Sequence, residues 1–246
     1  LNEINFDLVK KYKKKNLKCF NIISKNIIET KSEKEHKYLE PWIQWVSIHT
    51  GLSAKQHKIF RLGEIINYKN LEQIFELVES NQYKVGCISP MNTENKLINP
   101  AFFIPDPWTE TLSDSSFWSK LITKVTKYAV NNNTTQKVGI INYLSLGLIF
   151  FKFVRIKNYS TFLKLALKSI TRRWNKALFL DLLLNEIHVK WIKDKNPDFS
   201  TIFFNSGAHI QHHHLFTSKF INTSKDFISV SAKKNVDAFE EMIEIY

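Results

Sequence analysis

The chain has 246 residues and a mass of 29.0 kDa; 43% of its residues are hydrophobic and 24% are charged. This composition is typical of a globular protein and excludes a disordered chain, and two cysteines, Cys19 and Cys87, are too few for a disulfide framework. The longest apolar stretch, residues 144–151, is too short to span a bilayer, so we expect no transmembrane segment.

The net charge is +12 and the isoelectric point is about 9.5. A basic chain favours an anionic partner, such as a phosphate ester, a nucleic acid or an acidic lipid, although a solvated lysine-rich surface explains the same charge. Because the basic residues are mostly scattered lysines, we expect no specific nucleic-acid partner. Residues 152–176 alternate Phe, Leu, Lys and Arg, which fits either an anionic membrane surface or the outer face of helices.

Hydrophobic periodicity predicts most of the elements in chain order. It predicts helices at residues 5–18, 71–80, 117–130, 160–193 and 236–246, and short buried strands at 83–89 and 201–204. Residues 39–51 predict a loop that feeds a short helix, with proline at its mouth and Thr-Gly at its end. Residues 102–108 predict a rigid turn, because two prolines flank Asp106; the border of a pocket is the alternative.

Helices that alternate with isolated apolar strands predict an α/β fold with both faces of the sheet covered. Residues 108–195 offer almost no strand. The expected organisation is therefore an N-terminal part of the α/β core at 1–107, a mostly helical insertion at 108–195, and a return to the core at 196–246.

The two ends and the cysteines suggest the context of the chain. It begins with Leu1 rather than Met and stops within a helical pattern, so we expect a fragment truncated at both ends. Two unpaired cysteines favour a reducing, cytoplasmic compartment. The sequence does not indicate the oligomeric state.

Two segments carry candidate chemistry. The loop and helix at 39–51 contain Trp42, Gln44 and Trp45, and free N–H groups at a helix start suit an anion; alternatively, the tryptophans pack the helix onto the sheet. Residues 203–216 contain four histidines: His209, His212, His213 and His214. His209 is spaced three residues from His212 and four from His213, which lets two imidazoles face one metal ion if a helix begins here; surface histidines are the alternative.

Four motifs occur in an order that resembles the alkaline phosphatase superfamily, on the side of the type I phosphodiesterases and nucleotide pyrophosphatases. They are Leu1-Asn-Glu-Ile-Asn-Phe-Asp-Leu8, Thr50-Gly-Leu followed by His57 and Ile59, Lys84-Val-Gly-Cys-Ile-Ser-Pro-Met-Asn-Thr93, and Ala208-His-Ile-Gln-His212. The resemblance implies a three-layer α/β/α sandwich of the alkaline-phosphatase type with a helical insertion. It also implies a Zn- or Mn-dependent hydrolase that acts on a phosphate ester, or less readily on a sulfate ester.

By position, the resemblance also implies a ligand set. Asn2 falls on the first metal Asp of the family and His212 on a metal His, whereas Ala208 falls on a second Asp unless Asn205 with His209 is the correct register. Two carboxylates are thus replaced by uncharged side chains, for which Glu3 is a candidate replacement ligand. The family's later ligands would lie beyond the last residue.

The nucleophile of the family falls on Pro41, which has no hydroxyl or thiol. Glu40 is therefore the candidate general base for direct attack by water, and Trp42, Gln44, Trp45 and Asn92 are the candidate substrate contacts. The loss of the nucleophile keeps an alternative open: a non-catalytic domain of the same fold that binds a phosphorylated or sugar ligand.

Overall fold

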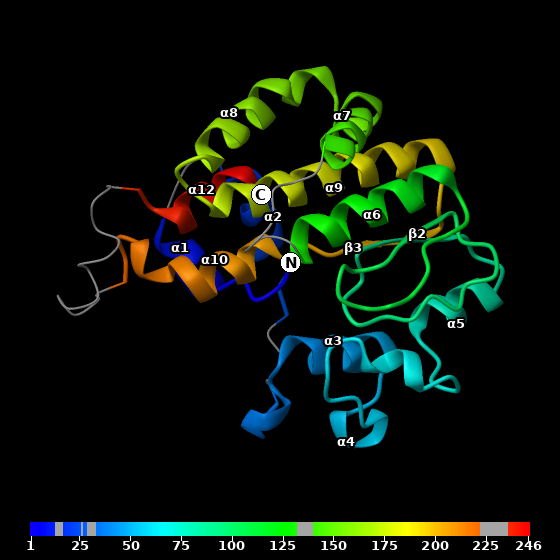
Figure 1. Cartoon of the computed structure of the whole chain (residues 1–246). Helices are drawn as coiled ribbons and strands as arrows, with labels where there is room; N and C mark the ends of the chain where they lie inside the picture. The colour runs from blue at the N-terminus through cyan, green and yellow to red at the C-terminus, as the bar shows by residue number, and fades with distance from the viewer. Residues whose placement is uncertain (13–16, 26, 29–32, 132–139, 222–235) are drawn as a thin grey trace. The chain divides into compact units, whose positions relative to one another are not determined.

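The computed structural model describes residues 1–12, 17–25, 27–28, 33–131, 140–221 and 236–246. It is a mixed α/β structure, mostly helical, with a small parallel sheet (Figure 1). The chain divides into two compact units. Unit 1 consists of Leu1–Lys31, Ser160–Leu182 and Phe204–Tyr246, and unit 2 of Ser32–Tyr159 and Leu183–Phe203.

The elements of unit 2 are η1 (His36–Tyr38), α3 (Pro41–Thr50), α4 (Ala54–His57), η2 (Glu64–Asn67), α5 (Ile74–Ser80), β1 (Val85–Ile88), β2 (Phe102–Ile104), α6 (Phe117–Asn131), α7 (Ile140–Phe153), η3 (Ile156–Asn158) and β3 (Phe199–Ile202). Those of unit 1 are α1 (Phe6–Lys11), α2 (Lys18–Lys25), α8 (Tyr159–Ser169), α10 (Ser206–His214), η4 (Leu215–Thr217) and α12 (Ala238–Ile245). Helix α9 (Trp174–Lys195) contributes residues to both units.

The sheet of unit 2 has the strand order β2-β1-β3, with both pairs parallel. Cys87 in β1 pairs with Phe103 of β2 and Thr201 of β3. The strand predicted at 83–89 is confirmed as β1, whereas the strand predicted at 201–204 is confirmed only at residues 201 and 202, because β3 begins at Phe199 and ends at Ile202. The prediction of a turn over 102–108 is wrong for its first three residues, because pairing with β1 makes them a strand before the prolines begin.

Helices pack against this sheet. Phe75 of α5 packs with Val85, Cys87 and Phe103. Side chains alternate along a strand, so Phe102 points to the opposite face, where its ring lies 5.1 Å from that of Trp191 in α9. Helix α6 packs along β2, and α7 packs on α6 (Figure 1).

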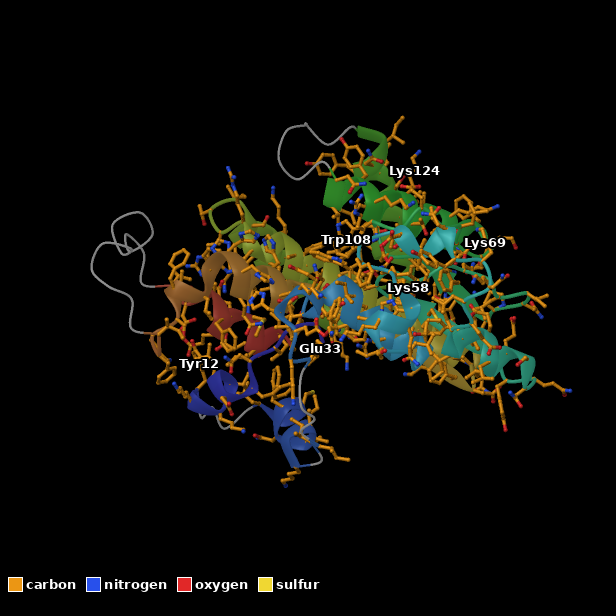
Figure 2. The ribbon with its side chains drawn as sticks, turned by 90° about the horizontal axis from the view of Figure 1, so that it is seen from below. Tyr12, Glu33, Lys58, Lys69, Trp108 and Lys124 are labelled. Carbon is orange, nitrogen blue, oxygen red and sulfur yellow. The ribbon has the colours of Figure 1, made fainter. Side chains whose placement is uncertain are left out.

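The core of unit 1 joins segments from both halves of the sequence. Leu8, Ile210, Phe239 and Met242 are buried in one cluster. Tyr12, labelled in Figure 2, adds a polar link, because its hydroxyl donates a 2.6 Å hydrogen bond to Asp237, the N-cap of α12. The predicted helix at 236–246 is confirmed as α12.

Three other predictions need correction or a limit. The single helix predicted at 160–193 is wrong, because α8 ends at Ser169 and α9 begins at Trp174. The helix predicted at 5–18 is confirmed over Phe6–Lys11 as α1, which ends at its C-cap Tyr12; residues 13–16 lie outside the described residues, and Lys18 begins α2. Within the part of the chain that the structure describes, no helix has the length and apolar character needed to cross a membrane.

Candidate functional site

The start of α10 is built around a buried carboxylate. Asp181 of α9 accepts a 2.8 Å hydrogen bond from the backbone N–H of Ser206 and a 2.6 Å bond from the hydroxyl of Tyr246. Burial raises the pKa of Asp181, while the hydrogen bonds from Ser206 and Tyr246 oppose the rise. The free N–H groups at this helix start are therefore used internally.

The N-terminal segment lies directly on this helix. The backbone N–H of Asn2 donates to the carbonyl of Phe204 at 3.1 Å, and its side-chain Nδ2 donates to Oδ1 of Asn205 at 3.0 Å. The close approach depends on Gly207: a Cβ at this position would collide with Cδ1 of Ile4 and lie 3.4 Å from the carbonyl oxygen of Asn2.

Gln211 fixes the turn that carries Glu3. Its Oε1 accepts the backbone N–H of Asn5 at 2.9 Å, and its Nε2 donates to the carbonyl of Glu3. The backbone of Glu3 has a φ of 52°, in the left-handed region that residues other than glycine rarely adopt. As a result, Oε2 of Glu3 lies 2.5 Å from Nε2 of His212, within hydrogen-bond distance.

The other histidines of α10 surround this pair along the helix. The rings of His209 and His213 lie 4.9 Å apart, and the ring of His214 lies 4.8 Å from that of Trp174. Burial, followed by repulsion from neighbouring histidines, lowers the pKa of His209 and brings that of His214 to about 4. Both imidazoles are therefore neutral at pH 7.

The donor set does not fit the two-metal centre that the resemblance implies. Among the residues described, no group of three or more His, Cys, Asp or Glu side chains is arranged to hold a metal ion. The side-chain nitrogen of Asn2 donates a hydrogen bond to Asn205, and one carboxylate oxygen of Glu3 contacts His212. A dinuclear site needs several anionic ligands around each cation, whereas Asn2, Glu3, Asn205 and His212 include one carboxylate, and that of Asp181 is buried and held by Ser206 and Tyr246.

The candidate residues on α3 belong to unit 2. Glu40 is the N-cap residue of α3, although its side chain makes no capping bond. Trp42 donates from Nε1 to the carbonyl of Phe60 at 3.0 Å, and Gln44 donates from Nε2 to the carbonyl of Tyr38 at 2.6 Å. These two bonds fasten α3 to the loops on either side of it.

Aromatic packing holds the rest of α3. The ring of Trp45 lies 5.6 Å from that of His49 and meets the edge of Phe203 at 5.2 Å. The structural alternative for the tryptophans, packing of the helix, therefore has direct support.

Asn92 joins its own loop to helix α3 and to the loop between α4 and η2. Its Oδ1 accepts the N–H of Gly63 at 2.9 Å, and its Nδ2 donates to the carbonyls of Trp42 and Arg61 at 3.0 and 3.2 Å. Its backbone N–H donates to the buried Asp106 at 2.6 Å. All these polar groups are used within the protein, so Asn92 acts as a structural junction here.

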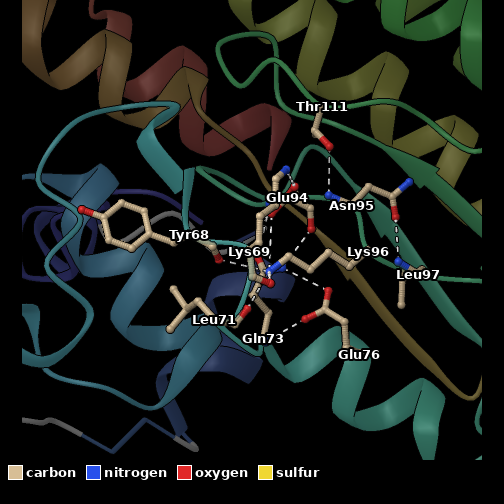
Figure 3. Close-up of polar contacts among 10 residues, drawn as sticks. All are labelled: Tyr68, Lys69, Leu71, Gln73, Glu76, Glu94, Asn95, Lys96, Leu97 and Thr111. Atoms are coloured by element: carbon tan, nitrogen blue, oxygen red, sulfur yellow. Dashed lines mark hydrogen bonds and ion pairs between the residues drawn. The ribbon is translucent and has the colours of Figure 1, made fainter. Parts of the chain in front are cut away.

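A second polar cluster nearby also holds the chain together (Figure 3). The ammonium of Lys96 donates to the carbonyls of Leu71 and Lys69 at 2.8 and 2.9 Å. Glu94 pairs with Lys69 at 2.5 Å, and its carbonyl accepts a 2.8 Å bond from Nε2 of Gln73. Lys96 therefore closes a turn and does not offer a free positive charge to a ligand.

His57, from the Thr-Gly-Leu motif, is also structural. Its Nδ1 accepts the N–H of Ile59 at 3.0 Å, so the neutral ring carries its proton on Nε2, 3.1 Å from Oγ of Ser47. In this tautomer His57 donates to Ser47 and cannot remove its proton. Burial lowers the pKa of His57, which favours the neutral form.

The structure thus brings Asn2, Glu3, Asn205 and His212 together in unit 1, whereas the candidate residues of α3 and Asn92 lie in unit 2. Comparisons with family models, curated proteins and solved structures find no match. The family resemblance therefore rests on the motifs alone. We call Asn2, Glu3, Asn205 and His212 the Glu3–His212 corner. Sequence reasoning missed Gln211 and Gly207, which hold the N-terminal segment against α10 at this corner. The only signal in the sequence was Gly207 itself, in Asn-Ser-Gly-Ala-His.

Proposed function

We propose that the chain is a divergent phosphoesterase-like hydrolase of the alkaline-phosphatase type, with His212 as the general base. The contact of the Glu3 carboxylate with Nε2 of His212, at 2.5 Å, is the observation that carries this proposal: a neutral His212 that donates from Nε2 to Glu3 keeps Nδ1 as the atom that accepts a proton. A carboxylate that holds an imidazole in one orientation is a recurrent arrangement for removing a proton from water or a hydroxyl. The side chain of His212 is 60% exposed, so a substrate can reach it.

The reaction follows from the groups of this corner. Water attacks the phosphorus atom as His212 takes its proton, the bond to the leaving oxygen breaks, and the proton returns to that oxygen. Asn205 and His209, four residues apart at the start of α10, carry N–H groups that suit the ester oxygens. No step in this scheme uses a metal ion, because the donors present do not fit one.

Steady-state hydrolysis of bis(p-nitrophenyl) phosphate, p-nitrophenyl phosphate and p-nitrocatechol sulfate tests the proposal. We expect Glu3→Gln and His212→Gln to lower kcat by about 10²–10⁴-fold, the usual contribution of a general base. His213→Gln is the matched control, because it removes an exposed imidazole of the same helix. Equal losses in all three variants, or activity lost with a chelator and restored by Zn²⁺ or Mn²⁺, would overturn the assignment.

The second candidate is the non-catalytic domain that binds a phosphorylated or sugar ligand. It is favoured by Pro41 at the family's nucleophile position and by the lack of a three-ligand metal group among the described residues. Calorimetric binding of p-nitrophenyl phosphate without turnover, weakened in His212→Gln, would establish this function in place of the first. The role of Glu40 as general base stays a prediction, which Glu40→Gln tests in the same assays.

A further inference from the structure

The net positive charge of the chain arises in one segment, because acidic residues are missing from it. Residues 115–180 contain twelve of the 35 Lys and Arg residues and no Asp or Glu, whereas the rest of the chain holds 23 basic and 23 acidic residues. This segment therefore accounts for the whole net charge of +12. It includes α6, α7 and α8.

Helix α7 in this segment exposes an apolar face. Ile141, Leu144, Leu148 and Phe151 are 68%, 64%, 58% and 74% exposed. Their spacing of three, four and three residues places them along one side of the helix. We call these four residues the α7 stripe.

The other side of α7 explains why the stripe faces outward. Ser145, Ile149 and Phe153 are buried, and α7 packs on α6, which in turn packs on β2. The helix is therefore the outer layer of unit 2 and is anchored by its buried side. Soluble proteins rarely leave large contiguous apolar surfaces uncovered without a partner for them.

Basic side chains lie close to the stripe in the sequence. Lys152 is exposed beside Phe151, and exposed Lys157 follows Ile156, which is itself 83% exposed. Lys124, labelled in Figure 2, is exposed on α6, the helix that carries α7. Helix α8 of unit 1, considered by itself, repeats the pattern: Leu163, Leu167 and Ile170 are exposed, and Lys164 and Lys168 lie between them.

We propose that the α7 stripe is a docking site for the surface of an anionic lipid bilayer. Apolar side chains on one helical face enter the boundary of the acyl chains, and nearby lysines contact acidic headgroups. Helix α7 has 14 residues, or about 21 Å, which is shorter than the ~30 Å hydrocarbon core, so the helix lies in the interface instead of crossing it.

Charge argues for this occupant over a second copy of the chain. A symmetric dimer through the α7 stripe would bring Lys152 and Lys157 of two copies together, and like charges oppose such a contact. An anionic bilayer supplies the opposite charge over a broad area. An acidic protein partner is a different proposal, which an absence of binding to either vesicle type would favour.

Sedimentation of the full chain with vesicles tests this inference. We expect binding to phosphatidylcholine vesicles that contain 30 mol% phosphatidylserine and none to pure phosphatidylcholine. Binding should weaken between about 0.1 and 1 M NaCl, because the screening length falls from about 10 to 3 Å. The double variant Leu144→Gln/Leu148→Gln should lower the partition coefficient roughly tenfold, as expected from losing the insertion of two leucines.

Matched controls separate docking from general stickiness. Ile98→Gln/Leu112→Gln removes apolar side chains that are 94% and 83% exposed elsewhere in unit 2, and it should bind like the unchanged chain. Lys152→Gln/Lys157→Gln should weaken binding, whereas Lys84→Gln/Lys193→Gln should not.

Four outcomes would overturn the proposal. They are equal binding to both vesicle types, no binding to either, equal losses in the apolar variant and its control, and concentration-dependent dimerisation without lipid that Leu144→Gln/Leu148→Gln abolishes. Circular dichroism of each variant verifies that it is folded. None of these substitutions touches the Glu3–His212 corner, so hydrolysis and docking fail independently.

Discussion

The hydroxyl of Tyr246 donates a hydrogen bond to Oδ2 of Asp181 across 2.6 Å, although 65 residues separate them. The same hydroxyl lies 2.6 Å from Oγ of Ser206 and accepts the N–H of Gly207 at 3.1 Å. Burial raises the pKa of Tyr246 well above 10, and the charge of Asp181 raises it further. The phenol therefore stays protonated and serves α10 as a donor.

Tyr246→Phe should lower the free energy of unfolding by about 1–3 kcal/mol, because it removes one donor from a buried carboxylate. Urea denaturation followed by circular dichroism measures this loss. Tyr83→Phe, at a tyrosine that is 57% exposed, should change stability by less than about 0.5 kcal/mol. Equal effects of the two substitutions would contradict the role given to Tyr246.

Two glycines should respond oppositely to alanine. Gly207→Ala should destabilise the protein by about 1 kcal/mol, because its Cβ collides with Cδ1 of Ile4 and the end of this flexible side chain has to move aside. Gly147→Ala should stabilise it by about 0.5–1 kcal/mol, because nothing lies within 4 Å and alanine favours the helix. Urea midpoints of both variants measure the contrast, and a neutral Gly207→Ala would remove the basis for the close approach.

Glu186 of α9 should matter more than a surface carboxylate. The carboxylate of Glu186 is fully buried. It accepts hydrogen bonds from the backbone N–H of Arg155 at 2.8 Å and from Nε of the Arg155 side chain at 2.9 Å. Burial alone would raise the pKa of Glu186, yet the bonds from Arg155 hold it below 4.5. Because the folded pKa is lowered, this stabilisation is present above pH 4.5 and is lost as the pH falls.

Glu186→Gln should therefore cost about 2 kcal/mol at pH 7, a value reduced because Arg155 is 40% exposed. Glu110→Gln is the comparison, because Glu110 pairs with Lys127 while it is 77% exposed, and it should cost less than about 1 kcal/mol. Chemical denaturation at pH 7 and pH 4 measures both. The difference in unfolding free energy between Glu186→Gln and the unchanged chain should be smaller at pH 4 than at pH 7.

His49 should make the protein sensitive to acid. Its ring packs against Trp45 and Phe75, its Nε2 is buried without a hydrogen-bond partner, and burial lowers its pKa from 6.5 to about 4. The unfolded chain therefore binds a proton before the folded chain does. Stability is full above pH 6.5 and falls as the pH drops towards 4.

His49→Leu should remove this dependence. Between pH 7 and pH 4.5 the variant should gain roughly 2 kcal/mol relative to the unchanged chain, since one pKa unit corresponds to about 1.4 kcal/mol. Unfolding free energies at both pH values measure the gain. His36→Gln, at an exposed histidine, is the control. Parallel stability curves for His49→Leu and the unchanged chain would contradict the prediction.

Local signals made several elements predictable. Pro41 stands at the first turn of α3, and Gly51 ends that helix with a φ of 70°. Strand β1 is a run of four residues that are all buried. Strand β2 could not be predicted in this way, because it has three residues and becomes a strand only through pairing with β1.

The candidate site was predictable only in part. The motifs pointed to Asn2 and His212, and in the structure Glu3, the residue after Asn2, contacts His212. The functions of Gly207 and Gln211 were not predictable, because each depends on a contact with residues about 200 positions away. Asn92 illustrates the opposite case: its position in a polar loop suggested a ligand contact, whereas its bonds join this loop to α3 and to a neighbouring loop.

The division into units has a consequence for synthesis of the chain. Unit 2 is complete once Phe203 has emerged from the ribosome, whereas unit 1 needs Leu1–Lys31 together with Phe204–Tyr246. Leu1–Lys31 must therefore wait for Phe204–Tyr246, and closing so long a loop is slow. Until then, the apolar side chains of α1 are exposed to chaperones and to other nascent chains.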